Sequence, residues 1–484
     1  MTIFYYFSLN TLQKMKFLKL SAILLFTFTN ICFAQTTTQK LEKAYQTLKN
    51  DDQAKYALTS LCVLDAKTGK VIFADNENIG LATASTLKTI TSATAFYTFG
   101  KDFKYETKLS YTGKITADGT LLGDIIITGS GDPTLASWRY EQTKENNILN
   151  QWATAIKAAG IKKIEGSVIS DDSTFGTSTI PTGWIWQDIG NYYGAGAGSI
   201  CWRENQFDVH LKPGTATGSE VEILKTVPNT PYIQLVNELK TGSSGTGDNA
   251  YGFLAPYTNV GYLRGTWGLG IKKSGISLSL PDAAFEAAYR LQDTLKRLNI
   301  ECSNAASSTR LLALEKKRIA SEQKSLLNIY SPSLSQIVYW FNKKSVNLYG
   351  EQLLKTIAFK QGKEASTRNG AKAVIDFWAA KGIDKKAMNM IDGSGLSPGN
   401  RITTMAMASI LFQAQKEEWF ADYVKSFPEN NGMTLKSGSI NDVSAYAGYY
   451  TNKNGEKYIT VININNYNGS GISRKLFKVL DALK

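Results

Sequence analysis

The stretch LATASTLKTI contains a serine, Ser85, that precedes a lysine, Lys88, by three residues. A serine hydroxyl is a weak nucleophile until a neighbouring base takes its proton. Residues three apart on a helix lie on the same face, so the Lys88 amine would reach the Ser85 hydroxyl. The amine must be neutral to act as a base, and burial or a second cation lowers a lysine pKa in this way. The pair therefore predicts a serine nucleophile with a lysine base, provided that suitable partners occur elsewhere in the chain.

The same spacing occurs a second time, at Ser321 and Lys324 in the stretch IASEQKSLL. The charges around this second pair predict a solvent-exposed helix, and no further hydroxyl or amide motif lies beside it. Spacing alone therefore does not identify the nucleophile.

Two downstream motifs supply partners for the first pair. The stretch KKSVNLYGEQLL places Ser345 and Asn347 at a junction between two predicted helices. The stretch GMTLKSGSI places Lys436, Ser437 and Gly438 immediately before the C-terminal hairpin. A hydroxyl and an amide can relay a proton, and the second lysine supplies the cation that lowers the pKa of the first. Other matches to each motif lie in turns or out of order, so we expect only this ordered trio to line one cleft.

Predicted secondary structure places these motifs at the edges of elements. Residues 60–74 alternate as a β-hairpin, and residues 85–100 have the pattern of a helix that a glycine ends. Residues 444–466 predict a second hairpin with Asn454-Gly455 as its turn. We expect both hairpins to lie in one sheet, so that the unit carrying the three motifs is discontinuous in sequence.

The region between residues 103 and 324 differs in character, because short strands alternate with loops rich in Gly, Ser and Thr. This pattern predicts an inserted β-rich region, built as two nested domains. The predicted fold class is α+β, and residues 35–102 and 325–484 form a discontinuous domain in which helices cover an antiparallel sheet.

The final helix of the chain places four apolar side chains on one face, namely Leu476, Phe477, Leu480 and Leu483. A face of this kind predicts packing on the neighbouring sheet. Contact with a membrane surface is the alternative.

The N-terminal stretch predicts export. Two lysines precede a short apolar run from about Leu20 to Phe33, and the small residue Ala34 precedes a polar segment, as in a secretory signal peptide. The apolar run is shorter than the roughly 20 residues that a membrane span needs. We expect residues 1–34 to be a signal peptide, with Met15 as an alternative start, and the mature protein to lie in the periplasm, either free or peripheral to the membrane.

Composition excludes several kinds of chemistry. The chain has one histidine, and it contains no CxxC motif, so we expect neither a zinc site nor another cofactor. The histidine, His210, precedes the GxSxG match at residues 395–399, which is the wrong order for an α/β-hydrolase triad. The net charge of +13 is not gathered in a basic cluster with interleaved aromatics, so nucleic acid is not an expected partner.

Three cysteines follow the predicted signal peptide. Cys62 lies in the strand pattern SLCVLD and is expected to be a buried apolar residue. Cys201 and Cys302 leave room for one disulfide bridge, which no further feature of the sequence supports.

Taken together, these motifs resemble those of the D-alanyl-D-alanine carboxypeptidase/endopeptidase family of class C low-molecular-mass penicillin-binding proteins, peptidase family S13. The resemblance covers nearly the whole chain after residue 34 and includes GSGDPTL, GWIWQDIGNYYGAGAGSI, SPSLSQIV and DGSGLSPGNRIT. Two positions depart from the family, Val346 where Asp is common and Ser437 where Thr is common. The resemblance implies a penicillin-binding/β-lactamase-like domain and accounts for the long insert.

The resemblance also implies an activity and residue roles. The protein would be a serine-type D-Ala-D-Ala carboxypeptidase or DD-endopeptidase that cuts peptidoglycan peptides ending in D-Ala-D-Ala, or cross-linked ones, and is acylated by β-lactam antibiotics. Ser85 would attack the carbonyl between the terminal D-alanines, with Lys88 as base. Ser345 would pass a proton to the leaving amine, and Asn347 would orient Lys88 and the substrate amide.

The third motif would bind the substrate. Lys436 and Ser437 would meet the terminal carboxylate, and Gly438 and Ser439 would complete the substrate-binding set. The backbone N–H groups of Ser85 and Ser439 would form the oxyanion hole.

Within the insert, the stretch ISDDSTF offers Asp171, Asp172 and Phe175 as candidates for the ammonium group and the aliphatic stem of a diaminopimelate side chain. The alternative is an aspartate pair that caps a turn.

Two other functions remain open at the level of sequence. A catalytically slow cell-wall binding module or β-lactam sensor is the alternative from another class of protein. A β-lactamase is disfavoured by the length of the chain and by the lack of an evident deacylating glutamate.

Overall fold

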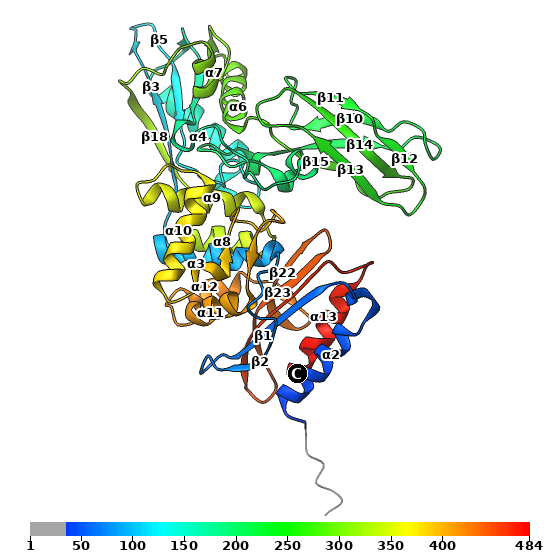
Figure 1. Cartoon of the computed structure of the whole chain (residues 1–484). Coiled ribbons are helices and arrows are strands. Elements are labelled where there is room, and N and C mark those ends of the chain that lie inside the picture. The colour runs from blue at the N-terminus through cyan, green and yellow to red at the C-terminus, as the bar shows by residue number, and fades with distance from the viewer. Residues whose placement is uncertain (1–34) are drawn as a thin grey trace, which may run out of the picture.

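The computed structural model describes residues 35–484, so the predicted signal peptide lies outside the described residues. An antiparallel sheet of six strands forms the lower part of the molecule in Figure 1, in the order β2-β1-β24-β23-β22-β21. Its strands are β1 (Leu58–Asp65), β2 (Val71–Asp75), β21 (Glu429–Asn430), β22 (Met433–Ile440), β23 (Val443–Thr451) and β24 (Lys457–Asn465). β1 pairs with β24 along its whole length. The two predicted hairpins therefore share one sheet.

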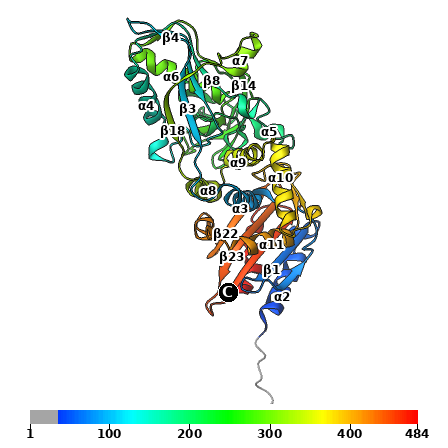
Figure 2. The same ribbon diagram turned by 90° about the vertical axis from the view of Figure 1, so that its left-hand side faces the viewer.

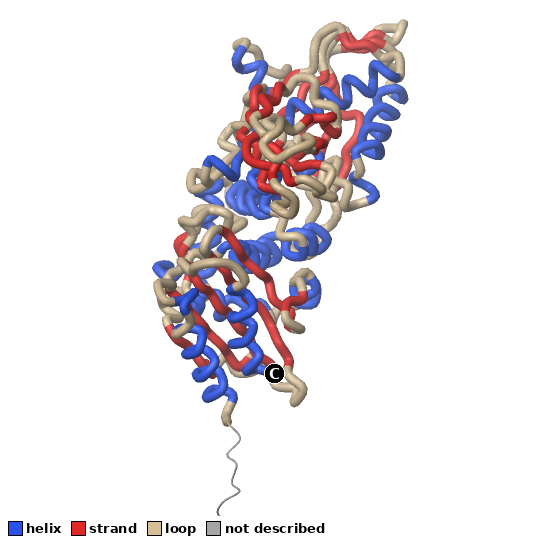
Figure 3. Tube along the Cα trace, turned by 90° about the vertical axis from the view of Figure 1, so that its right-hand side faces the viewer, coloured by secondary structure: helices blue, strands red, loops and turns tan. Residues whose placement is uncertain are grey.

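Two helices cover one face of this sheet, as Figure 3 shows: α2 (Thr37–Lys49) and α13 (Ile472–Leu480). Leu476, Leu480 and Leu483 are buried in a core that these helices share with β1, β22 and β24. Phe477 packs beside them, with its ring 4.7 Å from that of Tyr446. The apolar face of the last helix therefore packs on the sheet, and the membrane-surface alternative is wrong.

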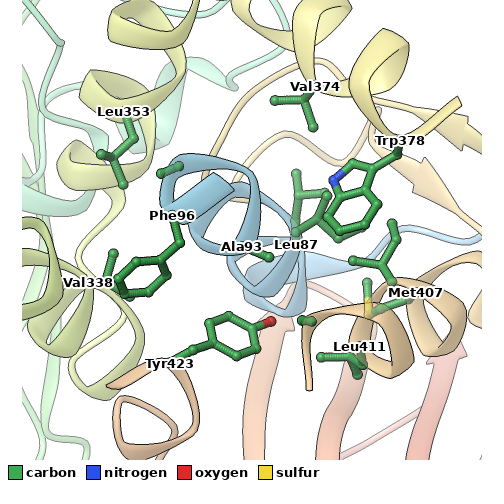
Figure 4. Packing of buried hydrophobic residues seen from close by; sticks show 14 of the residues in the cluster. Leu87, Ala93, Phe96, Val338, Leu353, Val374, Trp378, Met407, Leu411 and Tyr423 are labelled. Carbon is green, nitrogen blue, oxygen red and sulfur yellow. The ribbon is translucent and has the colours of Figure 1, made fainter. Parts of the chain in front are cut away.

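The other face carries the larger core. Its helices are α3 (Lys88–Phe99), α8 (Leu334–Lys343), α9 (Asn347–Lys360), α10 (Thr367–Ala380), α11 (Thr404–Ala414) and α12 (Phe420–Lys425). In Figure 2, α3 lies between the sheet and helices α8 and α9. Figure 4 shows Phe96 facing Val338 and Leu353, while Trp378 and Met407 close the opposite side. Helix α3 is thus enclosed by its neighbours, which gives the functional residue at its start a rigid support.

Small hydroxyl residues let α3 be buried on all sides. Ser92 and Thr94 donate their hydroxyls to the carbonyls one turn earlier, at 2.6 and 2.8 Å. The indole N–H of Trp378 donates to Thr94 Oγ1 at 2.8 Å. Because buried polar groups are costly unless they are paired, these hydrogen bonds make an interior helix of this composition stable.

The insert begins with two sheets and two long helices that pack around a core of their own. The sheets have the orders β17-β8-β6-β3-β18 and β16-β7-β5-β4. The elements are β3 (Glu106–Tyr111), β4 (Lys114–Ile115), β5 (Thr120–Leu122), β6 (Ile125–Thr128), α4 (Glu145–Ala158), β7 (Lys163–Ile164), β8 (Val168–Asp171), α6 (Ala283–Arg297), β16 (Glu301–Cys302), β17 (Ser307–Ser308), α7 (Thr309–Leu314) and β18 (Lys324–Tyr330).

The second SxxK pair lies at the end of this region, and its predicted helix is wrong. Ser321 lies in a loop, and Lys324 is the first residue of strand β18. β18 pairs with β3, more than 200 residues earlier in the chain. This long-range partner, which local charge does not reveal, makes the segment a strand.

Another separate core belongs to the sheets at the right of Figure 1. One sheet has the order β10-β9-β15, and in the other β14 pairs with β11, β12 and β13. The elements are α5 (Trp186–Ile189), β9 (Gln206–Lys212), β10 (Glu222–Val227), β11 (Gln234–Asn237), β12 (Lys240–Gly242), β13 (Asp248–Phe253), β14 (Val260–Gly268) and β15 (Gly275–Ser279). We propose two nested inserted domains on the basis of these two separate cores, with the C-terminal boundary near Tyr330 because β18 pairs with β3.

The remaining strands, β19 (Met388–Asn389) and β20 (Arg401–Ile402), pair with each other beside α10. None of the cysteines at positions 62, 201 and 302 is in a disulfide, so the bridge that the sequence left open between Cys201 and Cys302 is not formed. Cys62 is buried as predicted. Across residues 35–484, no helix combines the length and the hydropathy needed to cross a membrane.

Candidate active site

The first motif lies where a single 3-10 turn, Ala84–Leu87, leads into α3. Lys88 Nζ lies 2.8 Å from Ser85 Oγ, and it donates to Asn347 Oδ1 and to the Ser394 carbonyl, both at 2.6 Å. Ala84, directly before the serine, has a φ of 44°, in the left-handed region that non-glycine residues rarely adopt. Backbone strain of this kind persists only where surrounding structure holds it, and it is common at functional sites.

The surroundings of Lys88 favour a neutral amine. Its side chain is 0% exposed. Burial lowers the pKa of Lys88 well below its usual value, and the nearby Lys436 charge lowers it further, against the opposing charges of Asp392 and Glu351. The second cation that the spacing argument required is therefore present. A neutral amine beside a serine hydroxyl is arranged to take its proton.

The second motif lies between α8 and α9. Ser345 has a φ of 56°, again left-handed, and Asn347 is the first residue of α9. The Asn347 amide has a contact on each side, because its Oδ1 accepts from Lys88 and its Nδ2 donates to the Tyr193 carbonyl at 2.8 Å. Asn347 thus links the lysine to the inserted region.

The third motif lies on β22. Lys436 is 1% exposed, its Nζ donates to the Ser437 carbonyl at 2.6 Å, and burial lowers its pKa to about 7. A Cβ added at Gly438 would lie 2.8 Å from the backbone nitrogen of Ser85 and 2.7 Å from the Thr83 carbonyl oxygen. Only a glycine therefore lets the strand lie this close to the nucleophile.

These motifs meet at an open pocket of about 280 Å³. Its lining residues are Ser85, Ile185, Asp188, Tyr193, Ser345, Asn347, Leu396, Pro398, Ser439, Ile440 and Asn441. Four predicted site residues line it directly. Lys88 and Lys436 are buried beside it, while Ser437 and Gly438 belong to the strand that forms its edge.

The structure does not bring Asp171, Asp172 and Phe175 into this pocket. Asp171 Oδ1 accepts from the backbone N–H and the hydroxyl of Ser173, so this residue caps a turn, as the alternative interpretation predicted. Asp172 lines a different and much smaller cavity, of about 30 Å³, and Phe175 is buried. None of the three lines the Ser85 pocket, so their assignment to the substrate side chain stays a prediction that this geometry does not support.

Asp188 and Tyr193 line the Ser85 pocket, and neither was predicted from the sequence. They lie in the stretch GWIWQDIGNYYGAGAGSI, downstream of the aspartates that were chosen. Burial raises the pKa of Asp188 above its usual value, although a hydrogen bond from Tyr193 opposes the rise. Nothing in the local pattern distinguishes this acid from the earlier pair, because the path of the insert decides which one reaches the serine.

Asp392 was also missed, although the motif DGSGLSPGN contains it. Its Oδ1 accepts from Gly395 N at 2.7 Å, and its Oδ2 accepts from Ser397 N at 2.6 Å and from the Trp184 indole at 2.9 Å. The loop held in this way presents the Ser394 carbonyl to Lys88. Asp392 is therefore a positioning residue, and the serine of the GxSxG match is a buried loop residue.

We expect kcat/KM for a peptide with a free terminal carboxylate to fall as the pH rises through about 7, because Lys436 then loses the charge that attracts the carboxylate. In Lys436→Arg the guanidinium stays protonated, so this alkaline limb should move to higher pH. A pH profile of D-alanine release measures both effects, with thermal unfolding as the check that the variant is folded. An alkaline limb at the same pH in a folded Lys436→Arg variant would assign the titration to another group.

Comparison with known proteins places this site in a family context. Residues 41–430 match a sequence family that is described as the "D-Ala-D-Ala carboxypeptidase 3 (S13) family". D-alanyl-D-alanine carboxypeptidase DacB of Haemophilus influenzae is 27% identical over 425 residues, which are 84% of this chain and 85% of that protein. D-alanyl-D-alanine carboxypeptidase of Actinomadura sp. (strain R39) is 22% identical over 456 residues, 88% of this chain and 81% of that protein.

The fold has a solved counterpart. The crystal structure of penicillin binding protein 4 (dacB) from Haemophilus influenzae superposes with a TM-score of 0.76 at 24% identity, covering 92% of this chain and 98% of that one. The same protein complexed with a β-lactam superposes with a TM-score of 0.70 and covers 91% and 98% of the two chains. This likeness confirms the predicted fold class.

Proposed function

The chain belongs to the D-Ala-D-Ala carboxypeptidase 3 (S13) family, so it is a serine-type D-Ala-D-Ala carboxypeptidase, and we propose that Ser85 carries the acyl-enzyme of that reaction. The observation that supports the proposal is the contact of Ser85 Oγ with the buried Lys88 amine, 2.8 Å away, at a pocket lined by the second and third motifs. The substrates would be peptidoglycan peptides that end in D-Ala-D-Ala, or cross-linked peptides.

The proposed reaction follows from the roles of these groups. Neutral Lys88 takes the Ser85 proton as Oγ attacks the carbonyl carbon between the two D-alanines. The N–H groups of Ser85 and Ser439 would stabilise the oxyanion, since β22 lies close to Ser85. The proton on Lys88 then moves through the Ser345 hydroxyl to the nitrogen of the leaving D-alanine as the C–N bond breaks. Water attacks the ester carbonyl and gives a proton to Lys88, which returns it to Ser85 Oγ as the C–O bond breaks and the shortened peptide leaves.

The terminal carboxylate would meet the third motif. Lys436 carries the positive charge when protonated, and the carboxylate of the substrate favours that form by raising its pKa. A β-lactam carries a carboxylate in a similar place, which supports covalent inhibition at the same site.

The experiment that tests this function combines two measurements on the full protein. Intact mass after incubation with benzylpenicillin reports the acyl-enzyme, and D-alanine release from a pentapeptide reports turnover. A stable adduct together with D-alanine release supports the proposal. A stable adduct without D-alanine release would favour the β-lactam sensor, and rapid loss of penicillin with little adduct would favour the β-lactamase.

Location follows from the substrate. Peptidoglycan lies outside the cytoplasmic membrane, so we propose the periplasm, with export resting on the prediction for residues 1–34.

We propose Asp188 as the residue that recognises the side chain of the substrate peptide. Its carboxyl lies in the Ser85 pocket and, when ionised, can pair with a side-chain ammonium such as that of diaminopimelate. Asp188→Asn should lower kcat/KM about tenfold on a peptide with a free side-chain amine, since a hydrogen bond to a charged group is worth roughly 1.5–3 kcal/mol. Steady-state kinetics on that peptide and on its N-acetylated form measure the difference.

Asp171→Asn is the matched control for this prediction, because Asp171 caps a turn outside the pocket. The control should discriminate between the two peptides as the wild type does. Equal losses on both peptides in Asp188→Asn would remove Asp188 from side-chain recognition.

A further inference from the structure

An exposed group of aromatic side chains lies beside the Ser85 pocket, and the proposed reaction does not use it. Trp186 in α5 and Tyr192 in the turn after it are each 53% exposed, and Tyr262 on β14 is 38% exposed. Phe253 on β13 is half-buried and lies between Trp186 and Tyr262. We call Trp186, Phe253 and Tyr262 the aromatic platform.

Contacts make the platform continuous. The rings of Trp186 and Phe253 are 6.1 Å apart. Phe253 is paired with Tyr262 across the antiparallel strands, and the Arg264 guanidinium lies 5.2 Å from the Phe253 ring and 5.0 Å from the Tyr262 ring. The rings therefore run from α5 onto the outer face of the β13–β14 pair.

The platform is firmly joined to the pocket. Ile185 and Asp188, on either side of Trp186 in sequence, both line the pocket. The segment is held on β13 because Gly252 N donates to Asn191 Oδ1 at 3.0 Å. A Cβ at Gly190 would lie 2.2 Å from the Gly252 carbonyl oxygen, so the two backbones are in close contact. A ligand could thus touch the pocket and the platform without any rearrangement of the protein.

Packing of the sheet does not require these rings. Side chains alternate along a strand, and the inward-facing Leu263 and Trp267 of β14 are fully buried in the core. Large apolar side chains gathered on a surface, rather than scattered singly, mark an interaction site. The platform is therefore an exposed surface with a binding role to explain.

We propose that the aromatic platform binds the sugar rings of the peptidoglycan strand to which the substrate peptide is attached. The proposal rests on the proposed function, which brings the peptide into the adjoining pocket. A pyranose ring with equatorial substituents presents a flat face of C–H groups, which stacks on the electron-rich face of an indole or phenol ring. A stem peptide with carboxylates and amides has no comparable flat apolar face.

Geometry and charge also fit a sugar. Four residues separate the bond that is cut from the sugar in a pentapeptide stem, and they span at most about 14 Å when extended. The sugar is thus kept near the rim of the pocket, where the platform begins. Arg264 uses Nε to pair with Glu238 at 2.6 Å, and its remaining N–H groups can donate to N-acetyl or lactyl carbonyl oxygens.

The direct test uses chitotetraose, a tetramer of N-acetylglucosamine that carries no peptide. Titration of the full protein by isothermal calorimetry should show binding, weakened about tenfold or more in Trp186→Ala and in Tyr262→Ala, as for truncation of an aromatic anchor. Tyr262→Phe keeps the ring and should bind within about twofold of wild type. Trp138→Ala, which removes a tryptophan 44% exposed outside the platform, is the matched control and should bind as wild type does.

Three outcomes would overturn the proposal. The first is no binding of chitotetraose to the wild type, and the second is equal binding by wild type and both alanine variants. The third is a wild-type dimer that dissociates in Trp186→Ala while chitotetraose affinity stays unchanged, which would identify a second copy of the chain as the occupant. Analytical ultracentrifugation reports this third outcome.

A kinetic comparison separates this proposal from the proposed function. The ratio of kcat/KM on a disaccharide-pentapeptide to that on the free pentapeptide should fall about tenfold in Tyr262→Ala and stay unchanged in Trp138→Ala. If the wild type hydrolysed neither substrate, the proposed function would fail, whereas the chitotetraose titration would still decide for or against the platform. An unchanged ratio in an active Tyr262→Ala variant would contradict the platform alone.

Discussion

Replacing Ser85 with alanine is expected to abolish the covalent adduct with benzylpenicillin and to lower kcat for D-alanine release by about 10⁴- to 10⁶-fold, as when a serine hydrolase loses its nucleophile. The partners of Lys88 Nζ identify Ser85 as the group that gives up its proton, because they comprise one hydroxyl, that of Ser85 at 2.8 Å, and two carbonyl-type oxygens. Intact-mass spectrometry measures the adduct, and an assay of released D-alanine measures kcat.

The second SxxK pair provides the matched control for this prediction. Ser321 is exposed in a loop before β18, so Ser321→Ala should keep both the adduct and the turnover of the wild type. Loss of activity in Ser321→Ala, or an adduct of unchanged mass and stoichiometry on Ser85→Ala, would place the nucleophile elsewhere.

Removing the Lys88 amine is expected to have the second-largest effect. Lys88→Met keeps much of the length of the side chain but cannot take a proton, so the rate constant for acylation by benzylpenicillin should fall about 10²- to 10⁴-fold, the usual contribution of a general base. Lys88→Arg should lose about as much, because a guanidinium stays protonated and cannot act as a base. Time-resolved intact-mass measurements give these rate constants.

Lys88→Arg decides between two roles for this residue. If Lys88 served only as a positive charge, the arginine variant would acylate at close to the wild-type rate. Lys324→Met, at the start of β18, is the matched control and should leave acylation unchanged. The thermal stability of both Lys88 variants should be measured as a control for folding. In Lys88→Met, Asn347 Oδ1 and the Ser394 carbonyl lose a buried hydrogen-bond donor, which destabilises the fold.

Several features could be predicted because they depend on near neighbours in the chain. The alternation in β1 and the turn before β24 predicted two hairpins, and the apolar stripe of α13 predicted a buried face. The three motifs could be found because each is only three or four residues long. Their order along the chain separated them from chance matches.

Other features could not be predicted, since they depend on partners far away in sequence. Local charge predicted a helix around Ser321 and Lys324, but pairing with β3 makes the end of this segment a strand. Asp171 and Asp188 are both acids of the insert, but Asp188 lies in the segment that Asn347 binds through the Tyr193 carbonyl. The choice between them follows from that contact.

Whether a feature could be predicted from the sequence therefore depends on how far apart in the chain the interacting residues lie. Backbone preferences and side-chain periodicity act over a few residues, so the sequence was sufficient to name Ser85, Lys88, Ser345, Asn347 and Lys436 as candidates. The reactivity of these groups depends on desolvation and on nearby charge, which exist only after folding. Burial lowers the pKa of both lysines, and the Lys436 charge on β22 lowers the pKa of Lys88 further. Folding also brings the aromatic platform to the rim of the same pocket.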